Sequence, residues 1–261
     1  MSNPRLPAEI LDHVVEHLHD AKHALRNCCL VSKSWIPRTR QHLFADINLK
    51  TRERLKWWKE KFPDPSTSPG YYTRTLSISL FITAADAEVG GWIRGFSRVV
   101  RLVVGGDGFL PGASTISLTP FHGFSPIKSL YVNTLVVPSS QVFDFILSFP
   151  LLEDLTIRSC AMPIDNDDLS DGSSTAVPPP NLPVFSGVLN LSMVRGTSYI
   201  AHGLLSLPDG IRFRELGLTW TKEGDVSLTT ALVKSCSRTL EFLDVTCKPR
   251  CAYILYLSPH R

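Results

Sequence analysis

The decapeptide LLEDLTIRSC, residues 151–160, carries the pattern that decides the fold of this chain. Leu152 is followed three positions later by Leu155, and Ile157 comes two positions after that. Polar residues occupy the alternate positions. This period of two predicts a β-strand that turns Leu155 and Ile157 toward a core.

The same spacing of apolar residues recurs along most of the chain. Each unit has the pattern apolar-x-x-apolar-x-apolar, where x is any residue. The second apolar residues of the eight units are Ile47, Leu76, Leu102, Leu130, Leu155, Leu189, Leu216 and Leu243. They lie 29, 26, 28, 25, 34, 27 and 27 residues apart, and the units at Leu76 and Leu189 lack the first apolar residue. Separations this similar indicate an internal repeat.

These units resemble leucine-rich repeats, whose signature is L-x-x-L-x-L at a spacing of about 20–29 residues. Only Cys160 fills the Asn/Cys position that follows the strand in that family, so we expect irregular repeats. Helical periodicity lies between several of the strands, over residues 139–149, 198–207 and 225–236. The alternation predicts an α/β fold, with a leucine-rich-repeat-like solenoid and a parallel sheet over residues 46–261.

The one long separation between units contains DNDDLSDGSSTAVPPP, residues 165–180. This stretch is polar and rich in proline, and it has little to bury. We therefore expect a loop insertion over residues 163–183.

The first 45 residues have a different period. In RLPAEILDHVV the apolar residues fall on one face of a helix, which we expect from about Pro7 to His19. A second helical stretch surrounds residues 24–29, and a third begins at Pro37. Three short helices enclose too small a core to be stable unaided, so we expect part of their apolar surface to meet another chain.

The segments LPAEIL, CCLVSKSW and QHLF, in this order, resemble an F-box over residues 5–45. F-boxes are small helical units that dock on the Skp-type adaptor of SCF ubiquitin ligases, and a following repeat region commonly captures the substrate. The resemblance implies a three-helix F-box domain over residues 1–45. It implies an adaptor-facing surface made of Leu6, Pro7, Ile10, Leu11, Val14, Leu30, Val31 and Trp35. The alternative is that these apolar side chains only pack the three helices against one another.

Composition and charge limit the classes of partner. The 261 residues are 43% hydrophobic and 20% charged, with a net charge of +3, which is too small to predict binding to nucleic acid or a membrane. No signal-peptide-like or membrane-spanning apolar run is present, so we expect a cytoplasmic or nuclear protein. The stretch KTRERLKWWKEKF, residues 50–62, is strongly basic. It is typical of a solvated helix face, and the alternatives are a contact for an acidic partner or, less favoured, for nucleic acid.

Several chemistry-bearing patterns fall short of a catalytic or metal site. His13 and His17 lack the glutamate position and the third ligand of a zinc helix. Cys247 and Cys251 lack further ligands at zinc spacing, and GGDG at 105–108 is followed by no phosphate-binding fingerprint. We therefore predict no enzyme, and no catalytic, metal or cofactor residues.

Taken with the F-box resemblance, the repeats predict a substrate-receptor subunit that binds the adaptor, through it a cullin, and a protein substrate. The alternative is a repeat-based interaction scaffold without a ligase role. Alternate strand residues should line the face opposite the core and offer the substrate site. That predicted face comprises Arg101, Tyr131, Asn133, Asp154, Arg158, Asn190, Glu215 and Asp244.

Overall fold

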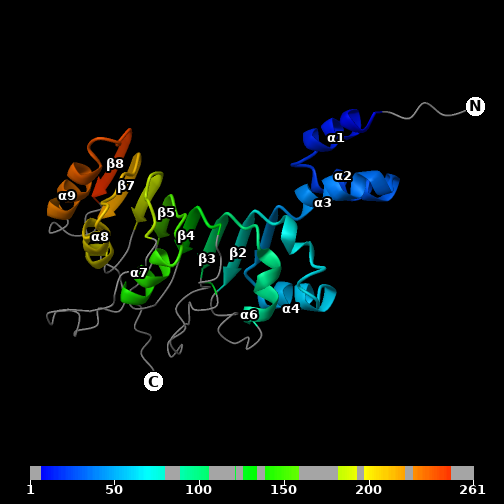
Figure 1. Ribbon diagram of the computed structural model, residues 1–261, viewed down its shortest axis with the longest axis horizontal. Helices are drawn as coiled ribbons and strands as arrows, with labels where there is room; N and C mark the ends of the chain where they lie inside the picture. The colour runs from blue at the N-terminus through cyan, green and yellow to red at the C-terminus, as the bar shows by residue number, and fades with distance from the viewer. Residues whose placement is uncertain are drawn as a thin grey trace, which may run out of the picture. The chain divides into compact units, whose positions relative to one another are not determined.

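The computed structural model describes residues 7–79, 89–105, 121, 126–133, 139–158, 182–192, 197–220 and 226–247. It confirms an α/β protein with parallel strands (Figure 1). The described residues up to Lys128 belong to one compact unit, unit 1, and those from Ser129 belong to a second, unit 2. The boundary predicted at residue 45 falls inside unit 1, between its helical part and its first strand.

The helical part of unit 1 contains the three predicted helices. They are α1 (Ala8–His17), α2 (Lys22–Val31) and α3 (Ile36–Leu43), with the 3₁₀ turn η1 (Lys33–Trp35) before α3. Pro7 precedes the first turn of α1 in an extended conformation, and Pro37 lies within the first turn of α3. Both prolines occupy places where a helix needs no backbone N–H donor.

The core of these helices is small. Among the side chains that the structure describes on these three helices, four are buried, namely Val15, Leu25, Cys28 and Thr39. The Oγ1 atom of Thr39 donates a hydrogen bond to the Trp35 carbonyl at 2.7 Å and lies 2.9 Å from the Cys29 thiol. This partnership allows a hydroxyl to be buried at little cost.

The remainder of unit 1 is a three-stranded parallel sheet with helical elements on one side. Its elements are β1 (Asp46–Leu49), α4 (Arg52–Lys61), η2 (Pro69–Tyr72), β2 (Thr75–Ser79), α6 (Val89–Trp92), η3 (Ile93–Phe96) and β3 (Arg101–Gly105). The ring of Trp58 on α4 stacks on Phe96 of η3 at 5.3 Å, and Leu55 is buried beside them. The periodicity predicted α4 and the strands, but it did not predict η2, α6 or η3.

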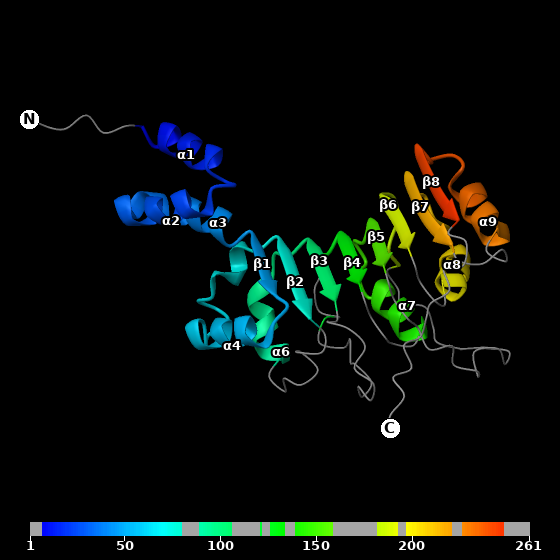
Figure 2. The same ribbon diagram turned by 180° about the vertical axis from the view of Figure 1, so that it is seen from behind.

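Unit 2 is a five-stranded parallel sheet in which neighbours along the chain are neighbours in the sheet. Its elements are β4 (Ser129–Asn133), α7 (Ser139–Leu147), β5 (Asp154–Arg158), β6 (Val188–Ser192), α8 (Thr197–Leu205), β7 (Glu215–Trp220), α9 (Val226–Cys236) and β8 (Phe242–Cys247). The three helices run along one side of the strands (Figures 1 and 2). The other face of the sheet carries the alternate, polar side chains.

The repeat alignment from the sequence is confirmed residue by residue in the strand register. In unit 1, Ile47 lies opposite Leu76, and Leu76 lies opposite Leu102. In unit 2, the corresponding residues follow one another across the sheet as Leu130, Leu155, Leu189, Leu216 and Leu243. From β2 to β7 these aligned leucines are buried.

A second regularity lies in the backbone just before the strands. The carbonyl of Ala45 accepts hydrogen bonds from the N–H groups of Arg74 and Thr75, at 2.8 and 2.9 Å. The carbonyl of Arg214 accepts likewise from Glu241 and Phe242, at 2.7 and 3.0 Å. The carbonyls of Arg74 and Gly187 also accept two such bonds each, and those of Val100 and Glu153 accept one each. The same type of backbone contact therefore recurs before most of the strands.

One predicted part of the core is wrong. Leu243 and Val245 on β8 are 44% and 41% exposed, although their register opposite Leu216 and Leu218 places them on the core side. A core-facing side chain needs cover from both neighbouring repeats, and within the described residues no strand follows β8. The loop insertion predicted over 163–183 lies outside the described residues, except for its last two positions.

Candidate protein-binding surfaces

Large apolar side chains are exposed on the helices of unit 1. Leu30 and Val31, at the end of α2, are 86% and 69% exposed. On α1, Ile10 and Val14 lie one helical turn apart, and both are exposed. Side chains of this kind are usually buried, and an exposed group of them marks a surface that binds something.

The helix geometry explains why these residues face outward. On α2 the core side is taken by Leu25 and Cys28, three positions apart, and Leu30 and Val31 fall beyond that face. On α1, Val15 points into the core, whereas Ile10 and Val14 face away from it. Of the other predicted adaptor residues, Pro7 is exposed and Trp35 is half-buried. Leu6 and the side chain of Leu11 lie outside the described residues.

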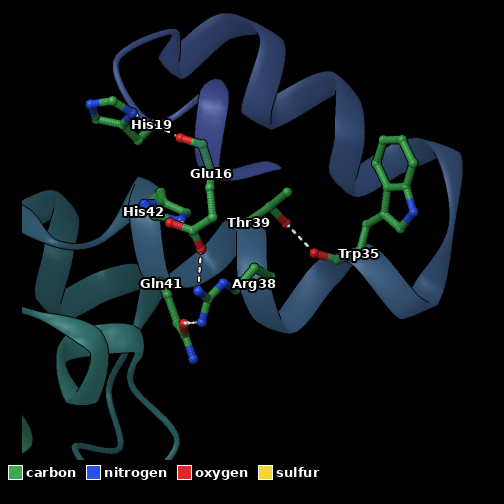
Figure 3. Close-up of polar contacts among 7 residues, drawn as sticks. All are labelled: Glu16, His19, Trp35, Arg38, Thr39, Gln41 and His42. Carbon is green, nitrogen blue, oxygen red and sulfur yellow. Dashed lines mark hydrogen bonds and ion pairs between the residues drawn. The ribbon is translucent and has the colours of Figure 1, made fainter. Parts of the chain in front are cut away.

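A polar cluster joins α1 to α3 (Figure 3). The carboxylate of Glu16 pairs with the guanidinium of Arg38 and lies 3.2 Å from Nε2 of His42. Arg38 also donates a hydrogen bond to Oε1 of Gln41 at 3.1 Å. Partial burial raises the pKa of Glu16, but its contacts with His42 and Arg38 outweigh this effect and leave the pKa below its usual range. The cluster sets the position of α1, and with it Ile10 and Val14.

The turn before α3 positions Trp35. The Ser32 hydroxyl accepts a hydrogen bond from the Ser34 N–H at 3.3 Å, and the Ser32 carbonyl accepts one from the Trp35 N–H at 3.1 Å. Thr39 holds the Trp35 carbonyl from the other side (Figure 3). Serine suits the first position of such a turn, since its hydroxyl replaces a missing backbone acceptor.

The outer face of the sheet in unit 2 carries seven of the eight predicted substrate-facing residues. They are Tyr131, Asn133, Asp154, Arg158, Asn190, Glu215 and Asp244, and all are half-buried or exposed. Arg158 lies over the ring of Tyr131, with its guanidinium carbon 5.7 Å from the ring centre. The eighth residue, Arg101, lies on β3 in unit 1 and is also exposed.

Two of these residues are occupied in holding the sheet. The Oδ1 atom of Asp154 accepts a hydrogen bond from the Val188 N–H at 2.9 Å, which links β5 to the start of β6. The Asn190 side chain covers Gly217, where an added β-carbon would lie 3.1 Å from its Nδ2 atom. Glu215 and Asp244 remain exposed carboxylates on this face.

Sequence reasoning missed one residue of this face. Phe242 on β8 is exposed and pairs in register with Glu215. Phe242 lies two positions before Asp244 in the strand, so the alternation that predicts Asp244 on the outer face predicts Phe242 there too. An aromatic residue at a position that is polar in most of the other strands could have identified it.

The described residues offer little for catalysis. They contain no group of three His, Cys, Asp or Glu side chains that could hold a metal ion. The Cys236 thiol is buried, and burial raises its pKa, which disfavours the nucleophilic thiolate. The described helices include none with the length and apolar character needed to cross a bilayer.

Comparisons of the chain with protein-family models, with curated proteins and with solved structures give no match. Two surfaces of the described residues are candidate binding sites. One is the exposed apolar surface of α1 and α2, and the other is the polar outer face of the sheet in unit 2.

Proposed function

We propose that this chain is a substrate-receptor subunit of an SCF-type ubiquitin ligase. Residues 1–45 form an F-box that docks on the Skp-type adaptor and, through it, on a cullin. Residues 46–261 form an irregular leucine-rich-repeat-like solenoid that binds a protein substrate. The observation that carries the proposal is the exposure of Ile10, Val14, Leu30 and Val31, at the positions where the F-box resemblance expects adaptor contacts.

The apolar helix surface supports docking on another protein. Burial of one such side chain contributes about 1.5–3 kcal/mol, so four of them can drive a stable association. Val15, Leu25 and Cys28 are buried between the helices, whereas the exposed residues lie outside that described core.

The sheet face of unit 2 supports substrate capture. Tyr131 and Arg158 are of the residue types enriched at binding hot spots, and they already contact each other. Prior contact lowers the entropy lost when a partner orders them. Exposed Phe242 beside Glu215 extends this face toward β8.

The proposed role is positional rather than catalytic. A substrate held on unit 2 would be kept near a ubiquitin-charged enzyme bound elsewhere in the ligase, at a high effective concentration. The chain itself needs no nucleophile, metal or cofactor for this task. The proposal places it in the cytoplasm or nucleus, where such ligases operate.

Co-purification with a purified Skp-type adaptor and cullin tests the proposal. We expect the wild-type chain to recover both proteins, and Leu30→Asp with Val31→Asp to weaken adaptor binding more than about a hundredfold. Both side chains are exposed, so the variant should fold, which circular dichroism checks. Val226→Asp replaces another exposed apolar residue, 62% exposed on α9, and is the control. Unchanged recovery by the folded double variant, or capture of other proteins without any adaptor, would favour a scaffold without a ligase role.

A further inference from the structure

The exposed face of α4 divides into two stripes of different charge balance. Glu53, Lys56 and Glu60 follow one another at helical spacing and together carry a net charge of −1. Nζ of Lys56 lies 3.8 Å from the Glu60 carboxylate. Hydrogen bonds from its own backbone N–H and from the Thr51 hydroxyl lower the pKa of Glu53, so this carboxylate stays ionised at the start of the helix.

The second stripe consists of Arg54, Trp57 and Lys61, three and four positions apart. Within the described part of the chain, neither Arg54 nor Lys61 forms an ion pair. Trp57 between them is 53% exposed, whereas Leu55 and Trp58 on the inner face of α4 are buried. The stripe therefore has two uncompensated cations on either side of an exposed aromatic ring.

The ring of Trp57 is held in place by an aromatic neighbour. It meets Phe62 edge to face, with ring centroids 6.2 Å apart, and Phe62 in turn contacts buried Trp58 at 4.7 Å. An exposed tryptophan supported in this way presents a fixed apolar surface, which is the usual anchor of a binding hot spot.

We propose that the Arg54–Trp57–Lys61 stripe binds an acidic protein segment in which two carboxylates flank an apolar side chain. The two cations are seven helical positions apart, which is a rise of about 10 Å. In an extended segment, side chains alternate between two faces, so two carboxylates four residues apart lie on one face about 13 Å apart, with the residue midway between them on that same face. The long side chains of Arg54 and Lys61 can span the difference. The apolar residue between the carboxylates would pack on Trp57.

The charges favour a protein segment over other polyanions. A nucleic-acid strand carries a continuous row of phosphates, whereas Glu53 and Glu60 interrupt the basic residues of α4 with negative charge. A membrane surface would require the apolar face of α4 for insertion, but that face is buried against Phe96. Two isolated carboxylates match two isolated cations without either cost.

Fluorescence anisotropy with the full chain at low salt tests this inference. The probe is a fluorescein-labelled Gly/Ser peptide with two aspartates four positions apart and a leucine midway between them. We expect saturable binding that weakens as salt rises, and that Arg54→Gln with Lys61→Gln weakens about tenfold. Trp57→Ala should weaken the binding as well. Lys56→Gln lies on the other stripe of the same helix, where Lys56 is paired with Glu60, and should change the binding less than about twofold.

Several results would overturn the inference. One is a loss of peptide affinity in Lys56→Gln as large as that in Arg54→Gln with Lys61→Gln. Another is equally tight binding of a control peptide whose two aspartates are adjacent. A third is the absence of saturable binding. Tighter binding of a single-stranded RNA or of phosphatidylserine vesicles, lost with the same variants, would assign the stripe to that ligand instead. The experiment contains no adaptor, so its outcome is independent of the ligase proposal.

Discussion

Replacing Gly187 with alanine should destabilise unit 2 by breaking one hydrogen bond between its strands. A β-carbon at this position would clash with Oδ1 of Asp154 and lie 3.2 Å from the Glu153 carbonyl oxygen. That Oδ1 atom accepts the hydrogen bond from the Val188 N–H at 2.9 Å. The carboxylate must therefore rotate away, and the N–H loses its acceptor.

The size of the effect follows from two opposed contributions. Loss of a hydrogen bond to a charged group costs about 1.5–3 kcal/mol. Alanine in place of glycine restricts the unfolded chain, which returns about 0.4–1 kcal/mol where the backbone tolerates it. The backbone at Gly187 is not in the left-handed region, so alanine itself is unstrained there. We expect a net loss of about 1–2 kcal/mol, equivalent to a fall in Tm of about 2–6 °C for a chain of this size.

A double-mutant cycle measured by urea unfolding, followed by circular dichroism, isolates the proposed cause. Asp154→Ala removes the same hydrogen bond, so it should cost a similar free energy of unfolding. The double variant should cost no more than Asp154→Ala alone, because the atom that clashes is gone. The coupling should then equal the cost of Gly187→Ala, about 1–2 kcal/mol. Gly91→Ala has no atom within 4 Å of the new methyl group and is the matched control. Additive effects in the cycle, or a neutral Gly187→Ala, would refute the reasoning.

The remaining predictions concern stability. Glu16→Gln should lower the free energy of unfolding by about 0.3–1 kcal/mol near neutral pH, since the ion pairs of Glu16 are partly exposed. The pKa of Glu16 is lower in the folded than in the unfolded chain, so the stability difference between wild type and variant should be complete at pH values above the unfolded pKa. It should vanish as the pH falls through the folded pKa, which urea titrations at a series of acidic pH values can follow. Gly203→Ala would place a methyl group 2.7 Å from the ring of Phe143 and should destabilise by about 1–3 kcal/mol in thermal melts; an unchanged Tm would contradict the packing of α7 on α8. Leu232→Ala in the core should lower the free energy of unfolding by about 2–5 kcal/mol. Leu243→Ala, at a partly exposed position, should lower it by less than about 1.5 kcal/mol. Equal losses of stability in the two variants would show that Leu243 on β8 is covered.

The strands were predictable because their signal is a repeated local pattern. In every repeat, the second of the three apolar positions is the second residue of the strand, as at Leu155 in β5 and Leu216 in β7. The helices α7, α8 and α9 followed from periodicity for the same reason. By contrast, η2 and η3 are single turns, too short to show a helical period, and their sequences PGYY and IRGF have no alternation either.

The surfaces were predictable only in part, because exposure depends on neighbours that the sequence does not reveal. Alternation correctly placed Tyr131 and Arg158 on the outer face, but it could not show that Asp154 is bound to the Val188 backbone. It could not show the exposure of Leu243 either, which reflects what lies beside β8 rather than its own pattern. The docking role of the helix surface rests on the F-box resemblance and stays a prediction.

The backbone contact before the strands has a consequence for how this sheet tolerates variation in chain length. Leu155 and Leu189 are 34 residues apart, yet they pair in the same register as Leu189 and Leu216, which are 27 apart. The Gly187 N–H still reaches the Glu153 carbonyl at 3.1 Å. Alignment of the strands is thus independent of the length of the connection between them, and lengthening a connection costs only the slow logarithmic growth of loop entropy. Insertions, deletions or grafted segments between strands can therefore change one rim of the sheet while the sheet itself stays constant.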